Sequence, residues 1–490
     1  MTLYDRFSTI AASHPNKIAF EDSSSAITYK KMLNDVIDSF EQLMNIDLVP
    51  GDRVAVSSAK PYPILVLELA CSRLGVTLVF LESFVAPNSK EWDEAVDSSS
   101  AHWTVTWSNR ETPHWTRTAV LHDNQSWHRP ILLQARTSGT TGKSKGVCLS
   151  EAALIEAVKN TQQIAKLTPS SRGMLIYEPL GLLSQIAAFS TLLAGATLVD
   201  GVAVADTPKH IAGFLEKNRI SHLVMVPQHI AATLDDPNLK RRNLSHLDTI
   251  MYGAAPVTSD LIKQARSTIN CRWLQCYGMT ETTGPVCWLA NEEQHRAGFS
   301  VGREAPGCTI KICDPESGEA LPAGKSGDVF IGGKLLMEGY WDPIKRCPEP
   351  GNSLNDGWLR TGDLGCLSPD GHLLLQGRAS DDIVCALGYT IKPAEIESIV
   401  IKVPGVVEAA AFGYEIGSAG VMPIVVCQVE DDPGKTQELI REACASNLDR
   451  SKQPTHFVLV DQPLPRGSNG KIQKAQLKKQ TAEHDLIPLN

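Results

Sequence analysis

Residues 137–146 read Thr137-Ser-Gly-Thr-Thr-Gly-Lys-Ser-Lys-Gly146, and they lie between the apolar runs 131–133 and 147–149. Small hydroxyl and glycine residues leave backbone N–H groups free to surround phosphate oxygens, and lysine adds positive charge beside them. The stretch therefore predicts a phosphate-binding loop. A flexible Ser/Gly linker is the alternative interpretation of the same residues.

The tripeptide Gly142-Lys143-Ser144 invites comparison with a Walker loop. That motif requires a glycine five positions before Gly142, and position 137 is a threonine. The spacing therefore excludes a kinase or ATPase of the P-loop class.

On either side of this loop, strand and helix patterns alternate. A strand near 53–57, a helix over 61–74 and a strand near 76–80 precede it, and a similar series runs from 174 to 226. This order predicts parallel sheets covered by helices. From about residue 301, short strands with frequent Gly and Pro turns indicate a small β-barrel, and beyond Arg378 the pattern becomes α+β.

The expected fold class is therefore α/β, with a large N-terminal domain over residues 1–378 and a smaller α+β domain over residues 379–490. At 490 residues the chain exceeds what one core usually supports, which agrees with such a division. The N-terminal domain is expected to contain two sheet-and-helix subdomains and the barrel, at about 1–165, 166–300 and 301–378.

Composition narrows the class of protein. The hydrophobic share of 42% and charged share of 21% are typical of globular chains, and the net charge of -9 argues against a general nucleic-acid binder. The 12 cysteines form no Cys-x-x-Cys pair, so they indicate reduced thiols and neither a zinc site nor a disulfide framework. The N-terminus has no secretory signal and no apolar run reaches about 20 residues, so we expect a cytoplasmic protein outside the membrane.

Further motifs follow the phosphate loop in a fixed order, and together they resemble the adenylate-forming superfamily, which includes acyl-CoA synthetases, peptide-synthetase adenylation domains and firefly luciferase. The segments that carry the resemblance besides 137–146 are Gly253-Ala-Ala-Pro256, Tyr277-Gly-Met-Thr-Glu-Thr-Thr-Gly284, Gly339-Tyr-Trp341, Gly357-Trp-Leu-Arg-Thr-Gly-Asp-Leu364, Gly377-Arg378, Gly388-Tyr-Thr-Ile-Lys-Pro-Ala-Glu-Ile-Glu397 and Pro465-Arg-Gly-Ser-Asn-Gly-Lys-Ile-Gln-Lys474.

The resemblance implies roles for the central segment in binding ATP and Mg²⁺. Tyr277 would stack on adenine, Thr280 would contact the α-phosphate and Glu281 would hold Mg²⁺, in keeping with the π-face that suits a purine and the hard oxygen that suits magnesium. Asp363 would accept hydrogen bonds from both ribose hydroxyls. The remaining nucleotide contacts implied are Thr137, Ser138, Gly139, Thr140, Thr141, Lys145, Gly253, Ala254, Ala255, Cys276, Gly278 and Arg378, with Thr140 also near the metal.

The resemblance also implies a mobile C-terminal domain that carries the catalytic lysine. Lys471 takes that role, because its charge can stabilise both the substrate carboxylate and the α-phosphate as they approach. Thr280 and Glu281 are the other implied catalytic residues. The hinge is Ser380 or Asp381, since the segment between Arg378 and Gly388 contains one residue more than the family pattern.

The acid pocket is expected to begin at the helix that follows Tyr177-Glu-Pro-Leu180. No carboxylate stands where amino-acid activators of the family hold the α-amine, so an ordinary α-amino acid is disfavoured, with Glu178 as the alternative group for that role. The leucines near 180 favour an aromatic, alicyclic or medium-chain acid, unless they only pack the helix into its subdomain. The residues expected to line the pocket are Leu182, Ile186, His229, Gly253, Gly278, Thr283 and Gly284.

For the acceptor, the resemblance favours CoA, because stand-alone members of this length most often form acyl-CoA. An amine or amino acid, giving an amide, is the alternative, as is the pantetheine of a carrier protein in trans. A nucleotide-binding regulatory protein without activity is the alternative from another class. The presence of Glu281, Asp363, Arg378 and Lys471 together argues against it.

Overall fold

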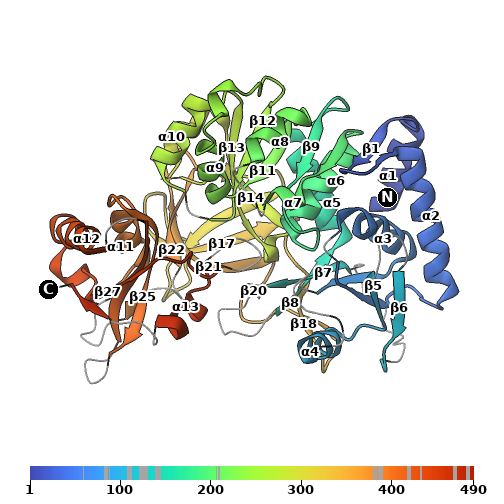
Figure 1. Ribbon diagram of the computed structural model, residues 1–490. Helices are drawn as coiled ribbons and strands as arrows, with labels where there is room; N and C mark the ends of the chain where they lie inside the picture. Colours follow the sequence, from blue (N-terminus) through green and yellow to red (C-terminus); the bar gives the residue numbers. More distant parts are fainter. Residues whose placement is uncertain are drawn as a thin grey trace.

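The computed structural model places the chain in one large N-terminal part and a smaller C-terminal part beside it (Figure 1). Within the described residues, no helix combines the length and the apolar character needed to cross a bilayer. The structure describes residues 1–58, 60–81, 87, 89–107, 113–120, 131–137, 145–205, 207, 210–255, 257–298, 300–378, 383–384, 390–416, 421–430, 433–466, 472–481 and 486–489.

The first large sheet has nine strands, and the six strands from β13 to β1 in its spatial order are parallel. Antiparallel strands complete both edges. In spatial order the strands are β15 (Arg303–Glu304), β14 (Gly284–Leu289), β13 (Arg272–Met279), β12 (Thr249–Gly253), β11 (His222–Met225), β9 (Arg172–Leu175), β10 (Thr197–Asp200), β1 (Ile18–Glu21) and β2 (Ala26–Thr28).

The second large sheet has eight strands, and the central four, from β7 to β5, are parallel. Its outer pairs are antiparallel. In spatial order the strands are β19 (Cys347–Glu349), β18 (Gly339–Asp342), β8 (Lys145–Ser150), β7 (Ile131–Thr137), β4 (Thr77–Phe80), β3 (Arg53–Val56), β5 (Trp103–Trp107) and β6 (Pro113–Arg117).

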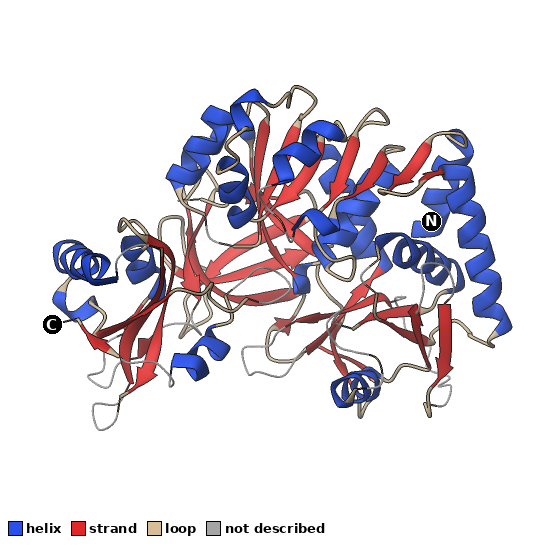
Figure 2. Cartoon of the chain, in the orientation of Figure 1, coloured by secondary structure: helices blue, strands red, loops and turns tan. Residues whose placement is uncertain are grey.

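Helices fill the space between the two sheets (Figure 2). The helix α6 (Leu182–Leu193) packs on β9, β10 and β14, whereas α5 (Glu151–Ala165) and α3 (Pro61–Leu74) pack on the second sheet, and α5 contacts α6 directly. The helices α1 (Leu3–Ser13) and α2 (Tyr29–Asn45) contact α3. Their buried faces form one continuous core, which is the main apolar cluster of the described chain.

The outer faces of both sheets carry cores of their own, because parallel strands are apolar on both sides. The helices α8 (Ile211–Lys217), α9 (Pro227–Leu234) and α10 (Ser259–Thr268) cover the nine-stranded sheet, and α4 (Lys90–Ser99) covers the other one. The short helix α7 (Val202–Ala205) precedes α8.

The last part of the N-terminal region is a five-stranded antiparallel sheet at the place where a small β-barrel was expected, and its described strand pairings do not close into a barrel. Its long central strand β21 pairs with three neighbours, so it holds the sheet together. The strands are β16 (Cys308–Cys313), β17 (Gly327–Gly333), β20 (Leu354–Asn355), β21 (Trp358–Leu367) and β22 (Leu373–Arg378).

The C-terminal part has its own sheet and its own apolar core, in which Ile396, Val425 and Phe457 are fully buried. These features confirm the expected α/β fold class, with a small α+β portion at the C-terminus. Its elements are β23 (Ile383–Val384), β24 (Thr390–Ile391), α11 (Pro393–Val400), β25 (Val406–Glu415), β26 (Val421–Val429), α12 (Pro433–Asn447), β27 (His456–Val460), α13 (Lys474–Thr481) and β28 (Ile487–Pro488).

Two segments cross the subdomain boundaries expected at 165 and 300. The hairpin β1–β2 pairs with β10 of the nine-stranded sheet, although its residues precede position 165. The segment Gly339–Trp341, expected in the β-rich portion, instead pairs with β8 of the eight-stranded sheet. In both cases an edge strand offers unpaired backbone groups to a segment that is distant in sequence.

Glu68 is a polar side chain that the main core buries without a hydrogen-bond partner among the described residues. Glu68 on α3 is fully buried, and both of its carboxylate oxygens lack a partner. Burial, with a smaller contribution from the charge of Glu151, raises the pKa of Glu68 well above its usual value of 4.5. Glu68 is therefore protonated in the folded protein under conditions in which an exposed glutamate is ionised.

We predict that Glu68→Gln stabilises the protein near pH 7 by more than about 1 kcal/mol. Well below pH 4.5, Glu68 is protonated in both the folded and the unfolded chain, so its titration does not change the free energy of unfolding. Above that pH the unfolded chain ionises while the folded one does not, so the wild type loses stability and the variant does not. Urea-unfolding midpoints from pH 4 to 8 test this, with Glu91→Gln at an exposed position of α4 as control. A gain of equal size at every pH would attribute the effect to packing.

Candidate functional site

The predicted phosphate loop connects two antiparallel strands of the eight-stranded sheet. Strand β7 ends at Thr137, β8 begins at Lys145, and these two residues are paired in the ladder. The loop is thus the tip of a β-hairpin. The predicted contacts Ser138, Gly139, Thr140 and Thr141 lie outside the described residues and stay predictions.

A buried polar cluster holds the base of this hairpin. The guanidinium of Arg53 lies 3.6 Å from the ring centroid of Trp341 and donates hydrogen bonds to Gln134 and to the backbone oxygen of Ser99. A Cβ atom at Gly146 would lie 2.4 Å from Nε2 of Gln134, so only glycine leaves room for this amide. The hairpin is therefore fixed to β3 and β18 below it.

Lys145 is the lysine of the predicted phosphate loop that the structure describes. Its side chain connects the hairpin to the segment 277–284. Its Nζ lies 4.8 Å from the ring centroid of Tyr340, within the range of a cation–π contact. The hydroxyl of Tyr340 donates a hydrogen bond of 3.0 Å to Oε1 of Glu281. Burial, and then the charge of Glu281, raise the pKa of Tyr340 to about 12, so its hydroxyl remains a donor at neutral pH.

Glu281 lies in the short 3₁₀ helix η3 (Thr280–Thr282), which follows β13. It is mostly buried, and its backbone oxygen accepts a hydrogen bond from the amide of Met337. No cluster of three metal-ligating side chains occurs among the described residues. One carboxylate nevertheless fits magnesium, which commonly takes one or two carboxylates and completes its coordination with phosphates and water.

Asp363 joins Tyr277 and Arg378, so three predicted nucleotide contacts meet at one carboxylate. The Tyr277 hydroxyl donates to Oδ2 at 2.5 Å, and Nε of Arg378 donates to Oδ1 at 2.8 Å. Asp363 and Arg378 are paired directly across β21 and β22. Burial, and then the charge of Asp363, raise the pKa of Tyr277 well above its usual value.

This carboxylate can accept more hydrogen bonds than the described side chains donate to it. An ionised carboxylate offers about four lone-pair positions, and each oxygen of Asp363 receives one donor from Tyr277 or Arg378. The remaining positions suit the two hydroxyls of a ribose. The sequence indicated each of these residues, but only the structure shows that they form one cluster.

The turn after β12 lies against β13. A Cβ atom at Gly253 would be 2.2 Å from the backbone oxygen of Cys276, so the two backbones approach closely there. The next residue, Ala254, has φ 63°, a left-handed conformation that is uncommon for alanine. The predicted contact Gly278 is similarly close to its neighbour, because its Cβ atom would be 2.0 Å from the oxygen of Gly284.

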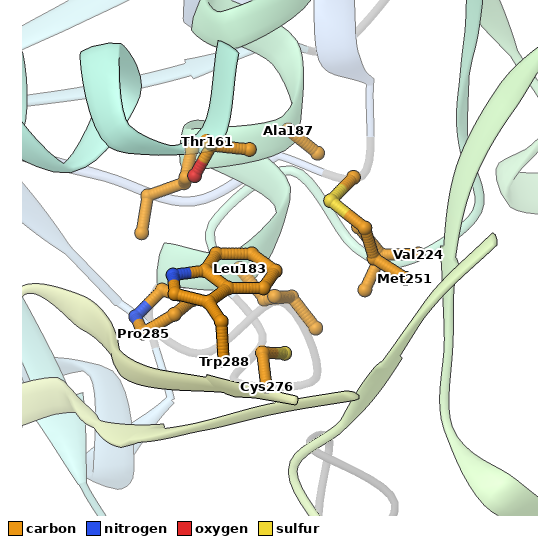
Figure 3. A pocket seen from close by; sticks show the side chains of 9 residues that line it. Thr161, Leu183, Ala187, Val224, Met251, Cys276, Pro285 and Trp288 are labelled. Carbon is orange, nitrogen blue, oxygen red and sulfur yellow. The ribbon is translucent and has the colours of Figure 1, made fainter. Parts of the chain in front are cut away.

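A small cavity lies between α5, α6 and the strands β11 to β14 (Figure 3). Of the residues predicted for the acid pocket, Ile186 lines it, and Cys276, predicted as a nucleotide contact, lines it too. The other predicted pocket residues, Leu182, His229, Gly253, Gly278, Thr283 and Gly284, are not part of this lining. The described residues that line it are Thr161, Leu183, Ile186, Ala187, Val224, Met251, Cys276, Pro285 and Trp288.

The sequence did not predict that Thr161 and Trp288 line this cavity, because both residues lie outside the recognised motifs. The alternation of side chains along a strand could have suggested which residues of β13 and β14 face the cavity. Cys276 and Tyr277 are neighbours in β13, so their side chains point to opposite faces of the sheet. Tyr277 reaches Asp363, whereas Cys276 lines the cavity behind the nucleotide segment.

His229 and Tyr177 form a separate pair near the start of α9. Their rings are stacked, with centroids 5.4 Å apart and an interplanar angle of 11°, and Nδ1 of His229 lies 3.2 Å from the Tyr177 hydroxyl. Burial lowers the pKa of His229, which favours the neutral ring at pH 7. At neutral pH, Tyr177 and His229 are therefore two uncharged rings packed against each other.

The predicted catalytic lysine and hinge fall outside the described residues. Lys471 follows the segment 467–470, and the residues on either side of this stretch, Arg466 and Ile472, form an antiparallel bridge. The hinge residues Ser380 and Asp381 follow Arg378, the last residue of β22. The roles of all three stay predictions.

Comparison with known proteins agrees with this geometry. Residues 97–341 match the AMP-binding enzyme family, and residues 395–471 match the AMP-binding enzyme C-terminal domain. An indoleacetate–CoA ligase of Aromatoleum aromaticum is 31% identical over 75% of this chain and 71% of its own length. A feruloyl-CoA synthase of Amycolatopsis is 27% identical over 96% of this chain and 97% of its own length.

The same fold occurs in solved structures. The crystal structure of ATP-bound MatB from Rhodopseudomonas palustris superposes with a TM-score of 0.84, at 24% identity, and covers 98% of this chain and 99% of that one. The chain therefore belongs to the adenylate-forming superfamily of AMP-binding enzymes, as the family matches, the curated relatives and the shared fold all indicate.

Proposed function

We propose that this protein is an ATP-dependent carboxylic acid ligase that forms an acyl-adenylate, releases pyrophosphate and transfers the acyl group to CoA. The observation that carries the proposal is the Tyr277–Asp363–Arg378 cluster, together with Glu281 beside Lys145 and Tyr340. These residues offer a π-face, a carboxylate for ribose and a second carboxylate near the phosphate hairpin. That set of groups suits a nucleoside triphosphate.

In the first half-reaction, the substrate carboxylate attacks the α-phosphorus in line with the departing pyrophosphate. Thr280 and Lys145 contact the phosphates, and Lys471 stabilises the charge that builds up between the carboxylate and the phosphate. Tyr277 and Asp363 hold the adenosine. Magnesium held by Glu281 would supply additional positive charge on the phosphate oxygens.

The acid in this proposal is an aromatic, alicyclic or medium-chain acid, because the helix α6 expected to begin the acid pocket is apolar at Leu182, Leu183 and Ile186. The curated relatives described above are named as CoA ligases of aromatic acids, which favours CoA as the acceptor. An amine acceptor, and a carrier protein in trans, are the competing outcomes.

Pyrophosphate release with Mg-ATP and a panel of aryl, alicyclic, fatty and amino acids, each with and without CoA, tests the proposal. Acid-dependent release that CoA accelerates, with an acyl-CoA product, is the expected result. Release that CoA leaves unchanged would direct the search to an amine or a carrier protein. Absence of release with every acid, despite ATP binding, would favour a regulatory nucleotide-binding protein.

Asp363→Asn is expected to raise the KM for ATP on the order of tenfold or more, because the amide offers one acceptor oxygen in place of two. Tyr277→Phe keeps the ring that would face adenine and removes only the hydrogen bond to Asp363, so a rise of roughly threefold is expected. Steady-state pyrophosphate assays measure both. Asp260→Asn, at an exposed position in α10, is the matched control. Unchanged KM values in both variants would remove Asp363 from the ATP site.

Lys471→Ala is expected to slow acyl-adenylate formation by at least about 100-fold, the usual order for losing one charge-stabilising group at a reacting centre. Transfer of the acyl group from supplied acyl-adenylate should stay within a fewfold of wild type, because that step follows adenylation. Separate assays of the two half-reactions distinguish these effects, with Lys479→Ala at an exposed position of α13 as control. Equal loss in both half-reactions would contradict the idea that the C-terminal part moves between them.

A further inference from the structure

A buried cation lies beneath the phosphate hairpin. Arg53 at the start of β3 is 3% exposed, and no described aspartate or glutamate forms an ion pair with its guanidinium. Burial lowers the pKa of Arg53 to about 10, so the side chain is still charged at neutral pH. A buried charge without a counter-ion is unfavourable unless other groups stabilise it. The groups that stabilise Arg53 therefore indicate what it does.

The end of α4 and an aromatic ring stabilise this charge in place of a carboxylate. Nε of Arg53 donates a hydrogen bond of 2.9 Å to the backbone oxygen of Ser99, the last residue of α4, where the helix carries partial negative charge. The guanidinium also lies 3.6 Å from the ring centroid of Trp341, whose π-face attracts cations. The indole N–H of Trp341 in turn donates to Oγ of Ser100 at 3.3 Å, so Arg53 and Trp341 are fixed against the same helix end.

Through its amide partner, Arg53 also reaches the hairpin that carries the phosphate loop. Nη2 of Arg53 donates a hydrogen bond to Oε1 of Gln134, which lies in β7 shortly before Thr137, where that strand ends. The amide of Gln134 occupies the space left by Gly146 in β8, since a Cβ atom there would lie 2.4 Å from Nε2. The position of both hairpin strands thus depends on where Arg53 holds this amide.

Through Trp341, Arg53 is connected to the side of the site that faces Glu281. Successive side chains of a strand point to opposite faces, so Trp341 of β18 faces Arg53 and Tyr340 faces away from it. On that other face, the ring of Tyr340 lies 4.8 Å from Nζ of Lys145, and its hydroxyl donates to Glu281. Arg53 therefore holds β18 from below while β18 presents Tyr340 above.

We propose that Arg53 is a positioning residue for the phosphates of ATP, which acts through Gln134 on the phosphate hairpin and through Trp341 on β18 without touching the nucleotide. Arginine suits both tasks, because its planar guanidinium stacks on a ring while its N–H groups donate within the plane, whereas a lysine ammonium does neither. This inference rests on the proposed function, and it adds to the ATP site a residue outside every recognised motif.

Arg53→Lys tests the proposal, because it keeps the positive charge and removes the planar fork. Calorimetric titrations of the full chain with Mg-ATP and, separately, with adenosine give the two Kd values. The Kd for Mg-ATP is expected to rise on the order of tenfold, and the Kd for adenosine to stay within about twofold, because adenosine has no phosphate for the hairpin to bind. A variant that only folds less completely would bind fewer equivalents of either ligand at unchanged Kd.

Gln134→Met removes the same hydrogen bond from its acceptor side, and it serves as the test if Arg53→Lys does not fold. The Kd for Mg-ATP is expected to rise roughly fivefold. The double variant should bind Mg-ATP no more weakly than Arg53→Lys alone, because both changes break one shared hydrogen bond. Val79→Ala, a fully buried position of β4 in the apolar cluster with α4, is the matched control and should leave both Kd values unchanged.

An unchanged Kd for Mg-ATP in both variants would overturn the inference, because other contacts would then hold the hairpin. An equal rise in Kd for adenosine and Mg-ATP would also overturn it, since Arg53 would then support the whole site and not the phosphate side. Multiplied effects in the double variant would contradict the path through Gln134. Absence of pyrophosphate release with every acid would instead contradict the proposed ligase function, and the titrations, which need no acid, would still decide the role of Arg53.

Discussion

The site depends on the carboxylate of Asp363, which Tyr277 and Arg378 approach from two different sheets. Tyr277 is in β13 of the nine-stranded sheet, whereas Asp363 and Arg378 face each other across β21 and β22 of the five-stranded sheet. Each oxygen of the carboxylate accepts one hydrogen bond, so the charge is held in place before a nucleotide binds. Arg378 is also the last residue of β22, so the same contact fixes the point at which the chain leaves for its C-terminal part.

A second connection brings the phosphate hairpin to this site. Lys145 begins β8 of the eight-stranded sheet, and its contact with Tyr340 leads through one hydrogen bond to Glu281 beside β13. Below the hairpin, the buried Arg53 packs on Trp341, the residue after Tyr340. The three sheets of the N-terminal region thus contribute to the one nucleotide site that we propose, and no single sheet presents all of its charges.

The opposite face of β13 contacts a mainly apolar region. Because side chains alternate across a strand, Tyr277 faces Asp363 while Cys276 faces the cavity between the sheet and the helices α5 and α6. One strand therefore separates a polar region for the nucleotide from a mainly apolar region behind it.

Much of the fold and the outline of the site could be predicted from the sequence. Local periodicity predicted the helix over 61–74, which α3 matches, because its apolar residues and the Pro and Gly at its two ends are local signals. Spaced motifs likewise indicated Tyr277, Glu281 and Asp363 one by one. What only the tertiary structure decided is how distant segments meet: the pairing of β1 with β10, the pairing of β18 with β8, the Tyr340–Glu281 hydrogen bond, and the meeting of α5, α6 and β11 to β14 around one small cavity. These arrangements depend on which strand edges and helix faces remain to be paired after the sheets have formed, and local sequence carries no record of that choice.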